Sequence, residues 1–257
     1  MASTETTGRI SDEQLPELIR LLGETDTVEL KLTVPDTDQR STVEALGMDP
    51  LEARLRQVFF FDTPDLALDR AGVVTRARRS QEKPDDSVVK LRPVDPEDLP
   101  PELRQAKGFG VEVDAMPGGF VCSGSFKHQF EAGPVREAAT GRRPLHKLFS
   151  KSQRAFWAEH APDGLDLDDL AVLGPVVVLK LKYEPEGYDR KLVAELWVYP
   201  DGSRILELST KCKPEEAFDV AARTRAYLSD RGVDLSGEQQ TKTRTALEYF
   251  SRQKQST

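Results

Sequence analysis

Apolar and polar residues alternate with a period of two in eight segments of the chain, the pattern of β-strands that have one apolar and one polar face. Val, Leu, Phe and Thr, which favour strands, are frequent in these segments, and Pro, Gly or Asp stands near their ends. The predicted strands are TVELKLTV (27–34), QVFFFDTP (57–64), GVVTRARR (72–79), DSVVKLRPV (86–94), GVEVDA (110–115), VVVLKLKYEP (176–185), KLVAELWVYP (191–200) and SRILELSTK (203–211).

Four other segments have the spacing or the end signals of helices. Ser11 is a candidate N-cap, and Gln14 three positions later completes a capping-box pattern. A later segment begins with Pro214 followed by acidic residues and ends at Gly232, as helices often do. The predicted helices lie within residues 11–24, 144–162, 213–232 and 238–253.

The remaining stretches predict connections. Residues 116–143 are rich in Gly and small side chains and are interpreted as a connection. The acidic stretch 163–170 is interpreted as a solvated loop, because its carboxylates lack the spacing of an EF-hand. The chain is therefore divided into a polar N-terminal segment with a short helix (1–24), a single domain (25–252) with a central helical insertion at about 116–175, and a tail (253–257).

Composition and charge exclude several classes of protein. A net charge of -8 at pH 7 would repel duplex nucleic acid and anionic membranes. There is no run of 18 apolar residues and no secretory pattern at the start, so we expect a soluble, cytoplasmic protein without a membrane partner. Cys122 and Cys212 are expected to be free thiols, and the three histidines lack the spacing of a zinc site.

The polar faces of the predicted strands carry Lys, Arg and Glu in place of the more usual Ser, Thr and Gln. Lys90 and Arg92 share one face of their strand, for example, and Leu91 lies on the other. One alternative is an antiparallel sheet whose charged face contacts water. Repetition of the pattern in six or seven strands favours an α+β, mainly antiparallel fold, an eight-stranded closed β-barrel or tunnel with the charges inside and amphipathic helices covering the outside.

A tunnel lined by both signs of charge is stable only if the charges pair, hydrate or bind ions. Arg and Lys bind phosphate oxygens, whereas carboxylates hold Mg²⁺ or Mn²⁺. The expected partner is therefore a small-molecule triphosphate or polyphosphate, with Mg²⁺ or Mn²⁺ as cofactor.

Several segments resemble those of the CYTH domain or triphosphate tunnel metalloenzyme family. TVELKLTV is similar to the ExExK strand that opens these domains, and QVFFFDTPDLALDRAGVVTRARR is similar to the next two strands. The likeness continues at VVKLR, GVEVD, VVVLKLKY and ILELSTK and covers most of residues 27–211. The resemblance implies an eight-stranded barrel that binds a triphosphate-containing substrate together with a divalent metal.

The resemblance also implies roles for individual residues. It implies Glu29, Lys31 and Glu207 as catalytic residues, Arg76, Arg78, Lys90, Arg92, Lys180 and Lys182 as phosphate-binding residues, and Glu29, Glu112, Glu195 and Glu207 as metal ligands.

Two departures from the family pattern leave the activity open. Thr27 stands where the family has the first Glu. Ser209 stands two residues after Glu207, where catalytic members often carry another carboxylate. The first hypothesis is a metal-dependent hydrolase acting on inorganic triphosphate, thiamine triphosphate or a nucleoside triphosphate. The alternative is a non-catalytic module that binds polyphosphate or a nucleotide, and the third is a class IV-like adenylyl cyclase.

Overall fold

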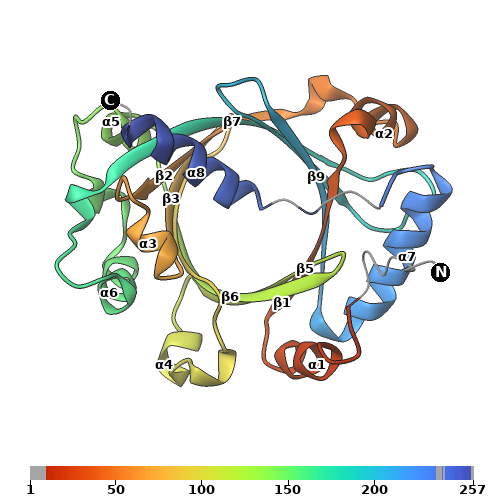
Figure 1. Ribbon diagram of the computed structural model, residues 1–257, viewed down its shortest axis with the longest axis horizontal. Helices are drawn as coiled ribbons and strands as arrows, with labels where there is room; N and C mark the ends of the chain where they lie inside the picture. The colour runs from red at the N-terminus through yellow and green to blue at the C-terminus, as the bar shows by residue number, and fades with distance from the viewer. Residues whose placement is uncertain (1–9, 236–238, 240, 256–257) are drawn as a thin grey trace, which may run out of the picture.

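Nine strands close into one barrel in the computed structural model, which describes residues 10–235, 239 and 241–255 (Figure 1). Around the barrel the order is β1-β5-β6-β4-β3-β2-β7-β8-β9, and β9 pairs with β1. The β1–β5 pair is parallel and the other eight pairs are antiparallel. The strands are β1 (Thr27–Val34), β2 (Arg54–Asp62), β3 (Val73–Ser80), β4 (Asp85–Leu91), β5 (Phe109–Met116), β6 (Gly119–Phe130), β7 (Ala171–Tyr183), β8 (Leu192–Val198) and β9 (Arg204–Cys212).

The closed, mainly antiparallel barrel is confirmed, but the predicted count of eight strands was wrong. The additional strand, β6, lies in residues 116–143, which were interpreted as a connection and as the start of a helical insertion. Small residues gave this segment a weak strand signal, and pairing with β4 and β5 overrides it. The small residue at Gly124 has a packing reason, because a Cβ there would lie 2.9 Å from the ring of Phe109.

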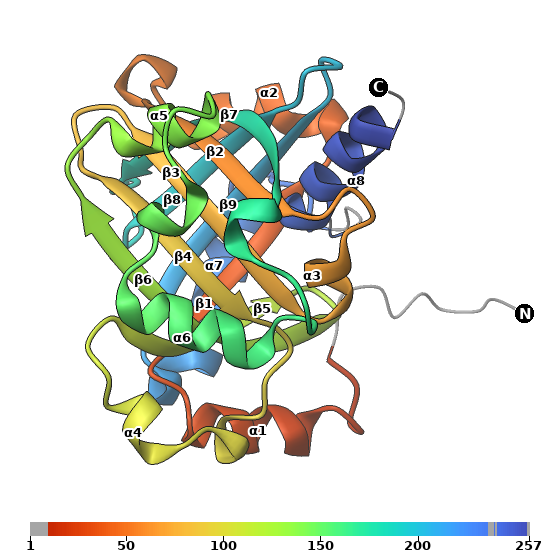
Figure 2. The ribbon, with the colours of Figure 1, turned by 90° about the vertical axis from the view of Figure 1, so that its left-hand side faces the viewer.

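The described residues form eight α-helices, and all but α8 lie around the outside of the barrel. α5 and α6 cover β3 and β4, as Figure 2 shows, whereas in Figure 1 α7 lies on the opposite side and α1 lies below the barrel. The helices are α1 (Leu15–Gly23), α2 (Gln39–Ala45), α3 (Ala67–Arg70), α4 (Pro101–Arg104), α5 (Pro134–Ala139), α6 (Lys151–His160), α7 (Ala217–Asp230) and α8 (Lys242–Gln255), with short 3₁₀ helices at Asp36–Asp38, Pro50–Glu52, Pro96–Asp98, Leu145–Leu148, Leu167–Asp169 and Pro214–Glu216.

The four predicted helical segments correspond to α1, α6, α7 and α8, with shorter bounds. Ser11 and Gln14 exchange the two hydrogen bonds of the predicted pattern, at 3.1 and 3.3 Å, but in the turn ahead of α1; the N-cap of the helix is Gln14, so the prediction of Ser11 as N-cap was wrong. The acidic stretch 163–170 contains one turn of 3₁₀ helix instead of being wholly loop. Residues 1–9 of the polar N-terminal segment, 238 and 240 of the last predicted helix, and 256–257 of the tail lie outside the described residues.

The outward faces of the strands are apolar and pack beneath the helices. Phe126 of β6 contacts Phe109 of β5 and Phe156 of α6, with ring centroids 5.0 and 5.5 Å apart. Leu18 and Leu21 of α1 pack against a second part of the barrel wall, and α2 and α7 cover a third. This arrangement confirms that the covering helices bury an outward apolar face, which stabilises the fold by roughly 1.5–3 kcal/mol for each large side chain that is fully buried.

One part of the barrel interior is apolar as well. Phe60 of β2 and Trp197 of β8 point inward and pack with Leu247 and Phe250 of α8. The start of α8 therefore lies against the inner surface of the barrel, whereas the other helices lie against its outer surface. This contact brings residues 241–244 to the cavity that occupies the rest of the interior.

Cys122 and Cys212 are buried free thiols, as expected. No helix among the described residues is both long and apolar enough to cross a membrane.

Adjacent residues on opposite faces of β6 provide a test of the arrangement. Phe126→Ala should lower the free energy of unfolding by about 3–5 kcal/mol, because it empties an aromatic cluster beneath α6. Lys127→Ala removes a side chain that lines the cavity and should change this free energy by less than about 0.5 kcal/mol. Urea denaturation measures both, and equal losses for the two variants would contradict the assignment of the faces.

Candidate functional site

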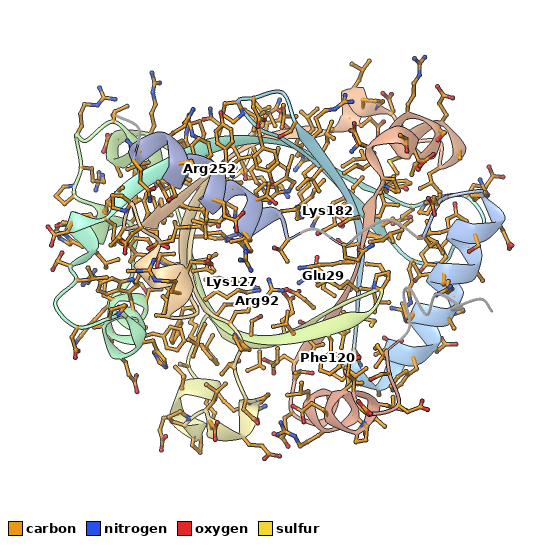
Figure 3. The ribbon with its side chains drawn as sticks, viewed as in Figure 1. Glu29, Arg92, Phe120, Lys127, Lys182 and Arg252 are labelled. Carbon is orange, nitrogen blue, oxygen red and sulfur yellow. The ribbon has the colours of Figure 1, made fainter. Side chains whose placement is uncertain are left out.

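A cavity of about 840 Å³ occupies the charged part of the barrel interior, lined by residues from all nine strands and from the start of α8. Its volume is typical of sites for small molecules, about 300–1,000 Å³. In Figure 3, Glu29, Arg92, Lys127 and Lys182 lie within the ring of strands, whereas Phe120 lies outside it. The charged faces of the strands therefore meet across one internal space.

Positive charge dominates this cavity although the whole protein carries a net charge of -8. Among the described residues, fourteen Lys and Arg and seven Asp and Glu line it. A cleft of one sign with low-dielectric walls attracts ions of the opposite sign, in this case anions. The cations are Lys31, Arg54, Arg56, Arg76, Arg78, Lys83, Lys90, Arg92, Lys127, Lys180, Lys182, Lys211, Lys242 and Arg244, and the acids are Glu29, Glu52, Asp69, Glu112, Asp114, Glu195 and Glu207.

All eleven site residues named from the sequence lie on the cavity wall, although their roles remain predictions. The other lining residues were not assigned to the site, and some of them carried a signal. The RLRQ alternation extends β2 back to Arg54, and Asp114 and Lys211 lie on the polar faces of predicted strands. Lys127 was missed together with β6, and Lys242 lies on a helix, where strand alternation gives no signal.

Several cations face the cavity without a carboxylate partner. Within the described part of the chain, Arg76, Lys127 and Lys182 form no ion pair within 4.0 Å, and the Nε of Arg76 is buried without a hydrogen bond. Burial, together with the neighbouring Arg78, lowers the pKa of Arg76 to about 10, so this guanidinium is still charged at neutral pH. An unpaired buried charge is costly, and a bound anion would remove the cost.

Arg92 is positioned by a backbone contact at the start of β3. The backbone N–H of Arg92 donates a hydrogen bond to the carbonyl oxygen of Gly72 at 2.8 Å. Gly72 has a φ of +76°, and a Cβ at this position would lie 2.8 Å from the carbonyl oxygen of Arg92. Glycine is therefore required where the chain enters β3 beside Arg92.

Three carboxylates form a cluster where β1 and β5 run parallel. Glu29, Glu112 and Asp114 each offer an oxygen within 4.8 Å of the others, and no second group of this kind occurs among the described residues. The side chain of Asp114 is 1% exposed, and neither of its oxygens makes a hydrogen bond of normal geometry. Such a set of oxygen donors suits Mg²⁺ or Mn²⁺.

Cations neutralise this carboxylate cluster in the free protein. The Nζ of Lys31 lies 2.8 Å from Asp114 and 3.5 Å from Glu29, and Lys90 and Arg92 each lie 3.7 Å from Asp114. Burial alone would raise the pKa of Asp114, but Lys90 and Lys31 hold it well below its usual range. Asp114 is therefore ionised at neutral pH.

Glu195 and Glu207, the other predicted metal ligands, do not belong to the carboxylate cluster and contact Lys242 of α8. The Nζ of Lys242 lies 2.6 Å from Glu195 and 2.7 Å from Glu207. Lys180 lies 2.5 Å from Glu195, and Trp197 donates an N–H to it at 3.2 Å. Burial alone would raise the pKa of Glu195, but Lys242 and Lys180 hold it well below its usual range.

Comparison with known proteins supports the fold. No family model and no curated relative matches the sequence. Among solved structures, a candidate adenylyl cyclase from Hippeastrum, described as revealing a dominant triphosphatase activity, is similar with a TM-score of 0.61 and 16% identity, over 84% of this chain and 92% of that chain. A candidate adenylate cyclase from Bacillus halodurans is similar with a TM-score of 0.59 and 13% identity, over 86% and 97% of the two chains. These likenesses show that the chain has the tunnel-barrel fold that the CYTH resemblance implied.

The electrostatics of the cavity predict an unusual titration of Lys90. Burial lowers its pKa to about 8, although Asp114 opposes the shift. Between pH 8 and the ordinary value of 10.5 the folded protein has released a proton that the unfolded chain retains, so the free energy of unfolding should rise with pH through this window.

A nuclear magnetic resonance titration of ¹³C-labelled lysine side chains measures this pKa, and Lys90→Met identifies the signal. Asp114→Asn should lower the pKa further, because it removes the neighbouring negative charge. A Lys90 signal that titrates near 10.5 in the native protein would contradict the prediction.

Proposed function

We propose that the cavity binds the triphosphate group of a small molecule and that the protein hydrolyses this group with the help of Mg²⁺ or Mn²⁺. The observation that carries the proposal is the excess of cations in the cavity of an acidic protein. An extended triphosphate carries several negative charges on adjacent phosphates and would pair with cations on several strands at once.

The phosphate-binding set includes the six cations named from the sequence. Arg76 and Lys182 have no acidic partner among the described residues, so they are available to phosphate oxygens without breaking an ion pair. Lys90 lies 3.7 Å from Asp114, and Arg78 lies 2.7 Å from Asp86. We add Arg56 and Lys127, which face the same cavity.

Metal binding is assigned to the carboxylate cluster of Glu29, Glu112 and Asp114. The buried oxygens of Asp114 lie beside the cationic groups of Lys31, Lys90 and Arg92, which fits a group that binds a cation. Glu195 and Glu207 remain predicted ligands, but in the free protein Lys242 occupies the position between their carboxylates. When bound, Mg²⁺ or Mn²⁺ supplies positive charge that stabilises the oxygens of the transferred phosphoryl group.

The remaining catalytic work is positioning and charge stabilisation. In hydrolysis, water forms a bond to the terminal phosphorus and the bond to the bridging oxygen breaks, so the products are phosphate and a compound with one phosphate fewer. Lys31, between Glu29 and Asp114, holds these two carboxylates together. Glu207 faces the same cavity and offers a carboxylate that can orient the attacking water.

The Hippeastrum protein supports hydrolysis, because a protein with this fold is described as having a dominant triphosphatase activity. The neutralised carboxylates and the hydroxyls of Thr27 and Ser209 favour the second candidate, a module that binds triphosphate without turnover. The adenylate cyclase names of the two neighbours keep cyclic AMP formation as the third candidate.

A matched pair of arginines on β3 tests the phosphate-binding assignment. Arg76→Met should weaken the binding of inorganic triphosphate about 10- to 150-fold, which corresponds to the roughly 1.5–3 kcal/mol of a charged hydrogen bond. Arg79→Met is the control, because Arg79 is not a cavity residue and donates to Gln57 at 2.7 Å. Calorimetric titration measures both affinities. Equal affinities for Arg76→Met and the native protein would contradict the proposed site.

A second experiment separates the three candidate activities. The protein is incubated with inorganic triphosphate, thiamine triphosphate and ATP, each with Mg²⁺ and with Mn²⁺, and released phosphate and cyclic AMP are measured. We expect phosphate release from at least one substrate, with Glu29→Gln inactive because a metal ligand is lost. Tight triphosphate binding in EDTA without any phosphate release would favour the binding module, and cyclic AMP from ATP would favour the cyclase.

A further inference from the structure

Lys211 reaches the carboxylate cluster from the strand next to Glu29. In the strand register Lys211 of β9 lies opposite Glu29 of β1, and Glu29 in turn lies opposite Asp114 of β5. The Nζ of Lys211 forms a short ion pair with Glu112 and lies 3.6 Å from Glu29. Its ammonium group is therefore shared by two of the three carboxylates assigned to the metal.

Two further neighbours of Glu29 and Glu112, one on β1 and one on β9, are neutral. Ser209 donates a hydrogen bond to Glu29 at 3.1 Å, and Thr27 donates one to Glu112 at 3.3 Å. Hydroxyl groups orient the two carboxylates but do not balance their charge. Lys211 supplies the positive charge on this side of the cluster, as Lys31 does beside Asp114.

The negative charge of the cluster is already balanced by neighbouring cations, so no excess of negative charge remains for a divalent ion. The cluster has three carboxylates, and four cations lie within 4.0 Å of them. A metal would have to displace at least one of these cations, because like charges repel at such distances. The side chain of Lys211 is 50% exposed and that of Lys31 is 19% exposed, so Lys211 can leave toward solvent at the lower cost.

We propose that Lys211 is a tethered cation that competes with a divalent metal ion for the cluster of Glu29, Glu112 and Asp114. This inference rests on the metal site of the proposed function. Under this proposal, Lys211 sets the affinity of the carboxylate cluster for a divalent metal ion. With Lys211 in place the free protein binds metal weakly, and metal enters when Lys211 turns away toward the phosphate oxygens of a ligand or toward solvent.

The test is direct titration of the protein with Mn²⁺ in the absence of triphosphate. Binding is measured by calorimetry and by the electron paramagnetic resonance signal of free Mn²⁺. Lys211→Met removes the ammonium and keeps a side chain of similar length. It should bind Mn²⁺ at least about tenfold more tightly than the native protein, because an adjacent unit charge is gone. Lys211→Arg keeps the charge and should bind as weakly as the native protein.

Lys83→Met is the matched control for the general loss of a positive charge. Lys83 is an exposed residue that lines the same cavity and belongs neither to the phosphate-binding set nor to the carboxylate cluster. Its replacement should change Mn²⁺ affinity by less than about threefold, since exposed charges away from the cluster are screened. Unchanged affinity in Lys211→Met, or an equal gain in Lys83→Met, would overturn the proposal.

Thermal unfolding gives a second readout. Mn²⁺ should raise the melting temperature of Lys211→Met more than that of the native protein, because a ligand that binds only the folded state stabilises it. Lys211→Gln serves if the methionine variant does not fold. Neither measurement involves hydrolysis, so this inference can fail while the phosphatase activity stands, and it can hold if the protein has no activity.

Discussion

The pairing of charges inside a closed barrel is the constraint on which the rest of this structure depends. The three acids of the carboxylate cluster and the two that contact Lys242 each have a cationic neighbour, because an unpaired carboxylate in that position would be too costly. The cations are more numerous than the acids, and some of them have no partner. An inward charged face also requires that the apolar face point outward, so the helices are needed to cover it.

In the proposed function the same cations have two sets of partners. In the free protein, Lys31, Lys211 and Lys242 hold carboxylates, and these contacts keep the interior stable. A polyphosphate would offer them a second set of anionic partners and release the carboxylates for a metal. Binding of the anion and binding of the metal would then be coupled through charge.

A tunnel barrel by itself does not specify one reaction. Two of the solved structures with this fold carry names that refer to adenylyl cyclase, and one is also described as revealing a triphosphatase activity. A fold can support several chemistries, so the function has to be argued from the site. In this chain the site is distinguished by neutral hydroxyls at Thr27 and Ser209 and by the ammonium of Lys211 between two acids.

The sequence alone determined most of the barrel and eleven of the twenty-one charged residues that line it. Alternation in eight segments separated charged from apolar faces, because successive side chains of a strand point to opposite sides, and all eleven residues that the family resemblance implied line the cavity. It did not reveal β6, whose small residues form a strand only when β4 and β5 pair with it. Nor could it place Lys242 beside Glu195 and Glu207, or Asp114 beside Lys31 and Lys90. These contacts join residues distant in the chain, and local periodicity carries no information about which distant charges meet, so only the closure of the barrel decided them.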